Sequence, residues 1–191
     1  FRNSINDFPK KEYLKPNVKN INLIKKDLDK KTKKIKIGFS WISKRLFYGK
    51  SKSIDLESLV PIFRIPNITF INLQYGDYKN DIQKLIKKNK FDILTLTQVD
   101  LYNDFENAAA LLSNLDLFIT VSSTTAHLSG ALGIPTWLIK PKNHASFHYW
   151  FQPNNKTPWY PSVTLFSQEK EIQKTIKEIK KNVLEKFNIN E

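Results

Sequence analysis

Residues 116–135 read D-L-F-I-T-V-S-S-T-T-A-H-L-S-G-A-L-G-I-P, and this stretch decides the fold. The apolar run 117–121 is typical of a buried strand. Residues 124–132 are expected to form a helix that stops at Gly133, a residue type that commonly follows the last turn. A strand that leads directly into a helix is the building unit of a parallel α/β sheet.

Four hydroxyl residues join this strand to this helix: Ser122, Ser123, Thr124 and Thr125. Free backbone N–H groups, the positive end of the helix dipole and several hydroxyls would meet there, which predicts an anion site suited to a diphosphate. The alternative is simple N-capping by one hydroxyl. His127, in the first helical turn, is either a donor to the phosphates or a satisfied buried histidine.

Strand-like and helix-like segments alternate over the rest of the chain, which predicts a Rossmann-like, doubly wound parallel sheet flanked by helices. The expected strands are 35–41, 68–73, 92–94, 117–121, 136–139 and 163–166. The expected helices are 55–63, 78–88, 104–114, 124–132 and 168–187. In such sheets ligands bind at the carboxyl ends of the strands, so the loops that follow strands are the places to inspect.

Residues 1–34 contain two prolines and a lysine-rich stretch, with one short helix expected around 21–28. This segment is interpreted as a linker or tail from a preceding domain. A nucleotide-sugar-binding domain is expected to occupy residues 35–191. The start at Phe1, without an initiator Met or the apolar core of a secretory signal, suggests a fragment.

The loop after the first strand carries Ser40, Lys44 and Arg45. A hydroxyl and two cations at this position would suit phosphate oxygens, with Arg45 as a planar fork and Lys44 as a point charge. In so basic a chain, a solvent-exposed pair is the alternative.

The loop after the second strand carries Gln74 and Tyr75. Gln74 offers a donor and an acceptor for a base or a ribose, and Tyr75 offers a stacking face. A plain turn around Gly76 explains the same residues.

The acidic residues favour structural roles over paired acid–base catalysis. Asp104 is predicted to cap the alanine-rich helix, and Asp116 to close it before the next strand. The aromatic stretch 144–150 and residues 157–161 are expected either to cover the cleft, to contact another domain, or to form an edge of the core.

Composition excludes several classes of protein. The chain has no cysteine, so disulfides and thiolate metal sites are excluded, and a cytoplasmic location is expected. Its three histidines, His127, His144 and His148, do not form a spaced ligand set, so no metal is expected. No apolar run is long enough for a membrane span.

The formal net charge is +13. The lysines recur mostly on the polar faces of the expected helices, which favours a solvated surface, with an anion-attracting field as the alternative. No nucleic-acid-binding motif is present, so a nucleic-acid partner is not expected.

Residues 116–135 resemble the donor-site signature of the heptosyltransferase-like family. They are most similar to the glycosyltransferase domains that follow tetratricopeptide repeats in bacterial proteins. Supporting matches lie in the same order along the chain: Gly38 to Trp41, Leu73 to Asp77, Asn103-Asp104, and Pro158 to Pro161 before Leu165-Phe166.

The resemblance implies the C-terminal half of a GT-B glycosyltransferase. It implies that Ser122, Ser123, Thr124, Thr125 and His127 line the diphosphate and sugar, that Ser40, Lys44 and Arg45 face the phosphates, and that Gln74 and Tyr75 lie near the nucleoside. The implied reaction is metal-independent transfer from a nucleoside-diphosphate sugar, a substrate and not a cofactor, to an acceptor hydroxyl. The acceptor site and the general base would belong to an N-terminal domain, with tetratricopeptide repeats as a further neighbour.

Two other functions stay open at this stage. A degenerate domain that keeps the fold and serves as an interaction module would have lost nucleotide binding. A basic nucleic-acid-binding domain would show a steep dependence on salt.

Overall fold

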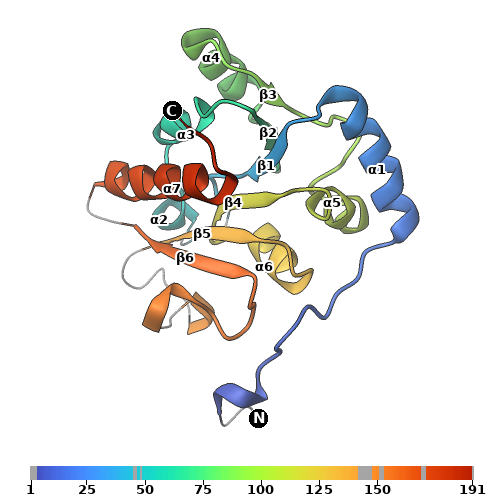
Figure 1. The fold of residues 1–191 in the computed structure, drawn as a ribbon, viewed down its shortest axis with the longest axis vertical. Coiled ribbons are helices and arrows are strands. Elements are labelled where there is room, and N and C mark those ends of the chain that lie inside the picture. Colours follow the sequence, from blue (N-terminus) through green and yellow to red (C-terminus); the bar gives the residue numbers. More distant parts are fainter. Residues whose placement is uncertain are drawn as a thin grey trace.

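The computed structural model of the chain describes residues 4–44, 47, 49–141, 148–150, 153–168 and 171–190 (Figure 1). Within these residues six strands form one sheet in the order β3-β2-β1-β4-β5-β6, and every neighbouring pair is parallel. The strands are β1 (Ile35–Phe39), β2 (Ile68–Asn72), β3 (Ile93–Leu94), β4 (Leu117–Val121), β5 (Thr136–Lys140) and β6 (Val163–Ser167). The predicted Rossmann-like, doubly wound sheet is confirmed.

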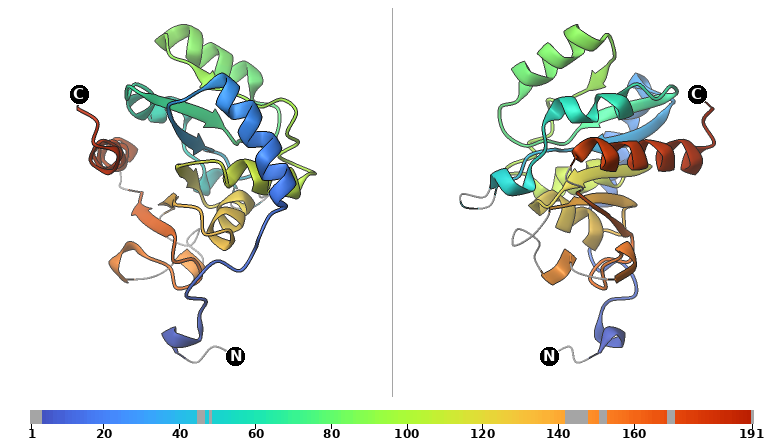
Figure 2. Two further views of the ribbon diagram at one scale, coloured as in Figure 1. Left: turned by 45° about the vertical axis from the view of Figure 1, so that its right-hand side comes forward. Right: turned by 90° about the vertical axis from the view of Figure 1, so that its left-hand side faces the viewer.

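Helices cover both faces of the sheet (Figure 2). The α-helices are α1 (Val18–Lys31), α2 (Gly49–Lys52), α3 (Val60–Phe63), α4 (Lys79–Asn89), α5 (Phe105–Leu112), α6 (Thr124–Ala131) and α7 (Ile172–Phe187). Short 3-10 helices are η1 (Ile5–Asp7), η2 (Leu56–Leu59), η4 (His148–Trp150) and η5 (Pro153–Asn155). Helices α1, α5 and α6 pack on one face, and α3, α4 and α7 on the other.

Strand β4 lies at the centre of the core. All five of its residues are buried, because β1 and β5 flank it and helices cover both of its faces. Leu117, Ile119 and Val121 point toward the layer that contains α3 and α7, whereas Phe118 packs with α1 and α5. This two-sided burial explains why 117–121 is a continuous apolar run instead of an alternating one.

Two of the helices expected in residues 35–191 differ clearly from the observed ones. The segment expected as one helix over 55–63 is divided into η2 and α3, with Pro61 in the first turn of α3. Proline has no N–H to continue a preceding helix but fits the start of a new one, which explains the division. The last helix begins at Ile172, four residues later than expected.

Helix α1 is longer than the short helix expected around 21–28. Asn17 caps its first turn by accepting from the N–H of Lys19, and Ile24 and Leu28 are buried in the cluster that contains α5. The interpretation of residues 1–34 as a linker or tail stays a prediction, and α1 within that segment is packed against the sheet domain. Among the described residues, no helix is long and apolar enough to cross a membrane.

A substitution in α1 tests how strongly this helix supports the domain. Leu28 is fully buried, so Leu28→Ala is expected to lower the free energy of unfolding by about 2–5 kcal/mol. Leu23 lies on the same helix but is 60% exposed. Leu23→Ala should therefore change the free energy of unfolding by less than about 0.5 kcal/mol. Urea unfolding of both variants makes the comparison, and equal values would show that α1 is not part of the cooperative unit.

Candidate functional site

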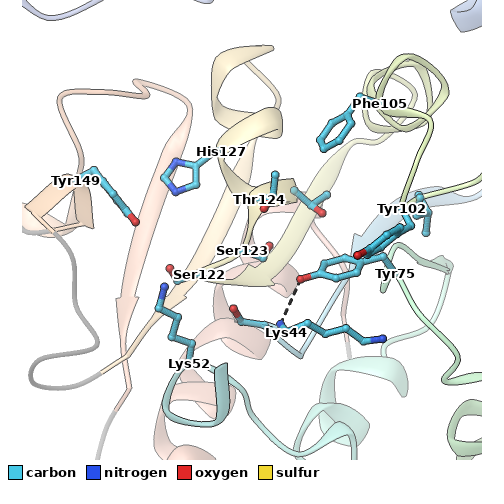
Figure 3. A pocket seen from close by; sticks show the side chains of 13 residues that line it. Lys44, Lys52, Tyr75, Tyr102, Phe105, Ser122, Ser123, Thr124, His127 and Tyr149 are labelled. Atoms are coloured by element: carbon cyan, nitrogen blue, oxygen red, sulfur yellow. Dashed lines mark hydrogen bonds between the residues drawn. The ribbon is translucent and has the colours of Figure 1, made fainter. Parts of the chain in front are cut away.

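A cavity lies where the sheet changes winding direction. Strand β1 pairs with β2 on one side and β4 on the other, so the connections that follow β1 and β4 diverge and leave a crevice at the carboxyl ends of the strands. The cavity there has a volume of about 570 Å³ (Figure 3). Its lining comes from the segments that follow β1 to β5: Ser43, Lys44, Lys52, Tyr75, Leu101, Tyr102, Phe105, Ser122, Ser123, Thr124, Thr125, His127 and Tyr149.

The start of helix α6 forms one wall of this cavity. Ser123 is the N-cap residue, and its hydroxyl accepts from the N–H of Ala126 at 3.3 Å. The first helical bond runs from the N–H of His127 to the carbonyl of Ser123. The N–H groups of Thr124 and Thr125 therefore have no intrahelical acceptor, and the positive end of the helix dipole lies beside the cavity.

The four predicted hydroxyls are brought together, but two of them already have structural bonds. The hydroxyl of Ser122 accepts from Trp150 Nε1 at 2.9 Å, and that of Ser123 caps α6. Thr124 is exposed and Thr125 is buried at the wall. The two threonines are consequently the hydroxyls best placed for a ligand.

The cavity contains a buried lysine that the sequence analysis did not select. Lys52, at the end of α2, is only 4% exposed, and its amine extends toward Ser122 (Figure 3). Among the described residues that line the cavity there is no Asp or Glu. A buried ammonium beside a helix N-terminus, in a cavity without acidic side chains, favours an anionic ligand.

His127 combines the two roles that the sequence left open. It lines the cavity, and its ring is also packed among aromatic side chains, stacked on Trp150 with a centroid separation of 4.7 Å. Its Nδ1 lies 2.9 Å from the hydroxyl of Tyr160. Burial, and secondarily the positive charge of Lys52, lower the pKa of His127 from 6.5 to about 4. The imidazole is therefore neutral at neutral pH.

This lowered pKa predicts a pH dependence of stability. Below pH 6.5 the unfolded chain binds a proton at His127 that the folded chain binds only near pH 4. The free energy of unfolding should thus fall between these pH values, by about 3 kcal/mol at most for this group. His127→Gln should remove this contribution. The difference in the free energy of unfolding between wild type and variant should therefore shrink on acidification. Urea unfolding at several pH values measures it, and a constant difference would contradict the assignment.

Of the residues predicted to face the phosphates from the loop after β1, Lys44 lines the cavity and Ser40 does not. Ser40 is buried, its hydroxyl pairs with Thr120 Oγ1 at 2.7 Å, and it is not among the residues that line the cavity. The amine of Lys44 lies over the ring of Tyr78, 5.3 Å from its centroid, and extends away from Ser122 (Figure 3). Arg45 lies outside the described residues.

A second cavity, of about 440 Å³, lies beside the first, at the carboxyl ends of β2 and β3. Tyr75, Leu101 and Tyr102 line both cavities. The apolar part of the lining of the second cavity comes from Ile82, Ile86 and Ile93. Thr95 and Thr97 contribute hydroxyls.

The two residues predicted near the nucleoside both border this second cavity. The amide oxygen of Gln74 accepts from the N–H groups of Trp41 and Ile42, and its nitrogen donates to two backbone carbonyls. Gln74 thus fixes the first loop, and its amide is fully engaged. The hydroxyl of Tyr75 accepts from the N–H of Lys44 at 3.3 Å, while its ring faces both cavities.

Asp104 has the predicted capping role, whereas Asp116 is bonded to β1 instead of closing helix α5, which ends at Leu112. Asp104 caps α5 by accepting from the N–H of Asn107 at 2.9 Å, and Asp116 accepts from the N–H of Lys36 at 2.7 Å. The described part of the chain contains no group of three or more His, Asp or Glu residues that could hold a metal ion.

The aromatic residues after β5 belong partly to the core and partly to the cavity. Trp150 and Tyr160 are buried in the cluster beneath α6, and Tyr149 lines the cavity. Residues 142–147, including His144, lie outside the described part, and only the backbone of His148 is described.

Comparison with known proteins gives one relative by sequence. No known protein-family model matches the chain. Protein FlbA of Caulobacter vibrioides is 30% identical over 165 residues, a match that covers 85% of this chain but 27% of FlbA. The chain therefore spans about a quarter of that relative's length.

Solved structures of glycosyltransferases share the fold. Escherichia coli ADP-heptose heptosyltransferase II matches 96% of this chain and 55% of its own, with a TM-score of 0.61 and 15% identity. A family 9 glycosyltransferase from Veillonella parvula matches 88% of this chain and 46% of its own, with a TM-score of 0.62 and 13% identity. E. coli heptosyltransferase WaaC with ADP-2-deoxy-2-fluoro heptose matches 81% of this chain and 44% of its own, with a TM-score of 0.55 and 17% identity. The chain thus has the heptosyltransferase-like GT-B fold over about half the length of such an enzyme.

Proposed function

We propose that this chain binds the diphosphate of a nucleoside-diphosphate sugar in the cavity between α2 and α6. The observation that carries the proposal is the buried Lys52 beside the start of α6, in a cavity whose described lining contains no acidic side chain. The ammonium would pair with one phosphate, and the N–H groups and hydroxyls of Thr124 and Thr125 would bind the other.

The nucleoside would occupy the second cavity. The two cavities meet at Tyr75 and Tyr102, so a diphosphate at α6 would direct its nucleoside toward β2 and β3. The apolar wall of isoleucines suits the face of a base, and Tyr75 offers a ring at the junction. Gln74 would support this site through the first loop, since its amide is already engaged there.

The reaction would be transfer of the sugar to an acceptor hydroxyl. The leaving diphosphate would be stabilised by Lys52, the helix N–H groups and hydroxyls, without a metal ion. The acceptor site and the general base would come from another part of the protein, an N-terminal domain with tetratricopeptide repeats as a further neighbour, in the cytoplasm. Support comes from the shared fold with WaaC, which was solved with an ADP-heptose analogue.

Calorimetric titration of the 191-residue chain with UDP, GDP and ADP tests the proposal. One nucleotide is expected to bind saturably with one-to-one stoichiometry. Raised salt should weaken this binding less than it weakens non-specific binding of anions to the surface of a chain with a net charge of +13. The double variant Thr124→Ala/Thr125→Ala should weaken that binding. Absence of saturable binding to all three nucleotides would reject the donor-site function and favour a degenerate interaction module.

A further inference from the structure

The imidazole of His127 presents its two nitrogens to different surroundings. Nδ1 is 2.9 Å from the hydroxyl of Tyr160, which is not among the residues that line the cavity, whereas His127 itself is. Nε2 is therefore the ring nitrogen available on the cavity side. Stacking on Trp150 and an edge contact with Tyr149, at centroid separations of 4.7 and 4.6 Å, hold the ring in this orientation.

Tyr160 is held in place by close packing, so its hydroxyl can determine which nitrogen of the His127 ring carries the proton. Its own ring packs against Gly130, where an added Cβ would approach it to 2.5 Å, so only glycine admits it this closely. Its ring also lies beside those of Trp150 and His127, with centroid separations of 5.9 and 5.6 Å. Burial raises the pKa of the Tyr160 phenol, so the phenol keeps its proton at neutral pH.

Tyr13 connects this pair to the segment that precedes α1. Its ring is stacked on Tyr160 with a centroid separation of 6.3 Å and an interplanar angle of 24°. The backbone N–H groups of Tyr13 and Leu14 both donate to the carbonyl of Ala131, at the end of α6. The N-terminal segment therefore lies against the same helix whose other end forms the wall of the cavity.

The number of protons limits how His127 and Tyr160 can be bonded. A neutral imidazole has one N–H and one acceptor nitrogen, and each phenol has one proton. If Tyr160 donates to Nδ1, the imidazole proton is on Nε2 and faces the cavity. The reverse order would place a lone pair there, which would repel a phosphate oxygen.

We infer that Tyr160 is a positioning residue, whose hydroxyl donates to Nδ1 of His127 and so keeps the Nε2–H directed into the cavity as a donor to an anionic ligand. The ligand part of this inference rests on the proposed function, whereas the proton position is a property of the free protein.

Nitrogen NMR of the histidine side chains tests the proton position directly. In the ¹⁵N-histidine-labelled chain, the signals of His127 are identified by their loss in His127→Gln, and long-range proton–nitrogen correlations report which nitrogen carries the proton. The wild type should show the Nε2–H form alone at neutral pH. Tyr160→Phe, which keeps the ring but removes the hydroxyl, should give a mixture of both forms.

Tyr149→Phe is the matched control, because Tyr149 also touches the His127 ring but is not the partner of its Nδ1. It should leave the proton position unchanged. An Nδ1–H form in the wild type, or a Tyr160→Phe spectrum identical to wild type, would overturn the inference.

Titration with inorganic pyrophosphate distinguishes this inference from the proposed function. Tyr160→Phe should bind pyrophosphate roughly three- to tenfold more weakly than wild type, as expected for the loss of one oriented hydrogen bond. A wild type that shows the Nε2–H form but binds neither pyrophosphate nor nucleotides would reject the diphosphate site and keep the proton assignment. Unchanged affinity in Tyr160→Phe would overturn the positioning role.

Discussion

Lys52→Ala is expected to reduce the affinity for the nucleoside diphosphate by roughly 30- to 1,000-fold, about 2–4 kcal/mol. The size of this effect follows from burial: Lys52 is only 4% exposed, so neither water nor salt can readily replace its ammonium at the phosphate. Calorimetric titration with the nucleotide that the wild type binds best measures the loss.

Lys50→Ala is the matched control for this variant. Lys50 lies on the same short helix, α2, but is exposed and is not among the residues that line the cavity. It removes the same charge from the chain, so it reports the contribution of net charge alone, which should be less than about 1 kcal/mol. Equal losses in the two variants would mean that the nucleotide is attracted by the basic surface and not bound at the cavity.

Trp150→Ala is expected to have the largest effect on stability, a loss of about 3–5 kcal/mol in the free energy of unfolding. Trp150 is fully buried in the cluster beneath α6, its Nε1 donates to Ser122, and its ring stacks on His127. Truncation leaves a large void and a buried Ser122 hydroxyl without its donor, and it removes the support of the cavity wall. Nucleotide binding should therefore decrease together with stability.

Trp159→Ala provides the comparison, because Trp159 is of the same type and is only half-buried at the edge of the same cluster. Urea unfolding should show a smaller loss for it than for Trp150→Ala. A loss below about 1 kcal/mol for Trp150→Ala would contradict the burial of this side chain in the cluster.

The strands and helix α6 were predictable because their signals are local. The run 117–121 is apolar throughout, since β4 is buried on both faces, and Gly133 ends the helix with φ +74°. Pro135 lies just before β5, as expected. The cap by Asp104 was predictable for the same reason, because it involves residues three positions apart.

The residues that form the site could be predicted only in part, because their positions depend on contacts between distant parts of the chain. Lys52 has no local sequence feature that separates it from the many exposed lysines; it is buried because the segment after β1 folds back on itself, with the N–H of Ser43 bonded to Ser53. Gln74 was expected at the nucleoside but is bonded to the first loop, more than 30 positions away. Such bonds leave no periodic trace in the sequence.

The central claim is that the cavity between α2 and α6 binds a diphosphate, and ligand-induced shifts in a two-dimensional amide NMR spectrum test it most directly. On addition of the nucleoside diphosphate that binds best, the largest shifts should fall on the amides of residues 122–127, Lys52 and Tyr75, with saturation at one equivalent. Shifts confined to the lysine-rich faces of α4 and α7, growing without saturation and vanishing with salt, would contradict the account.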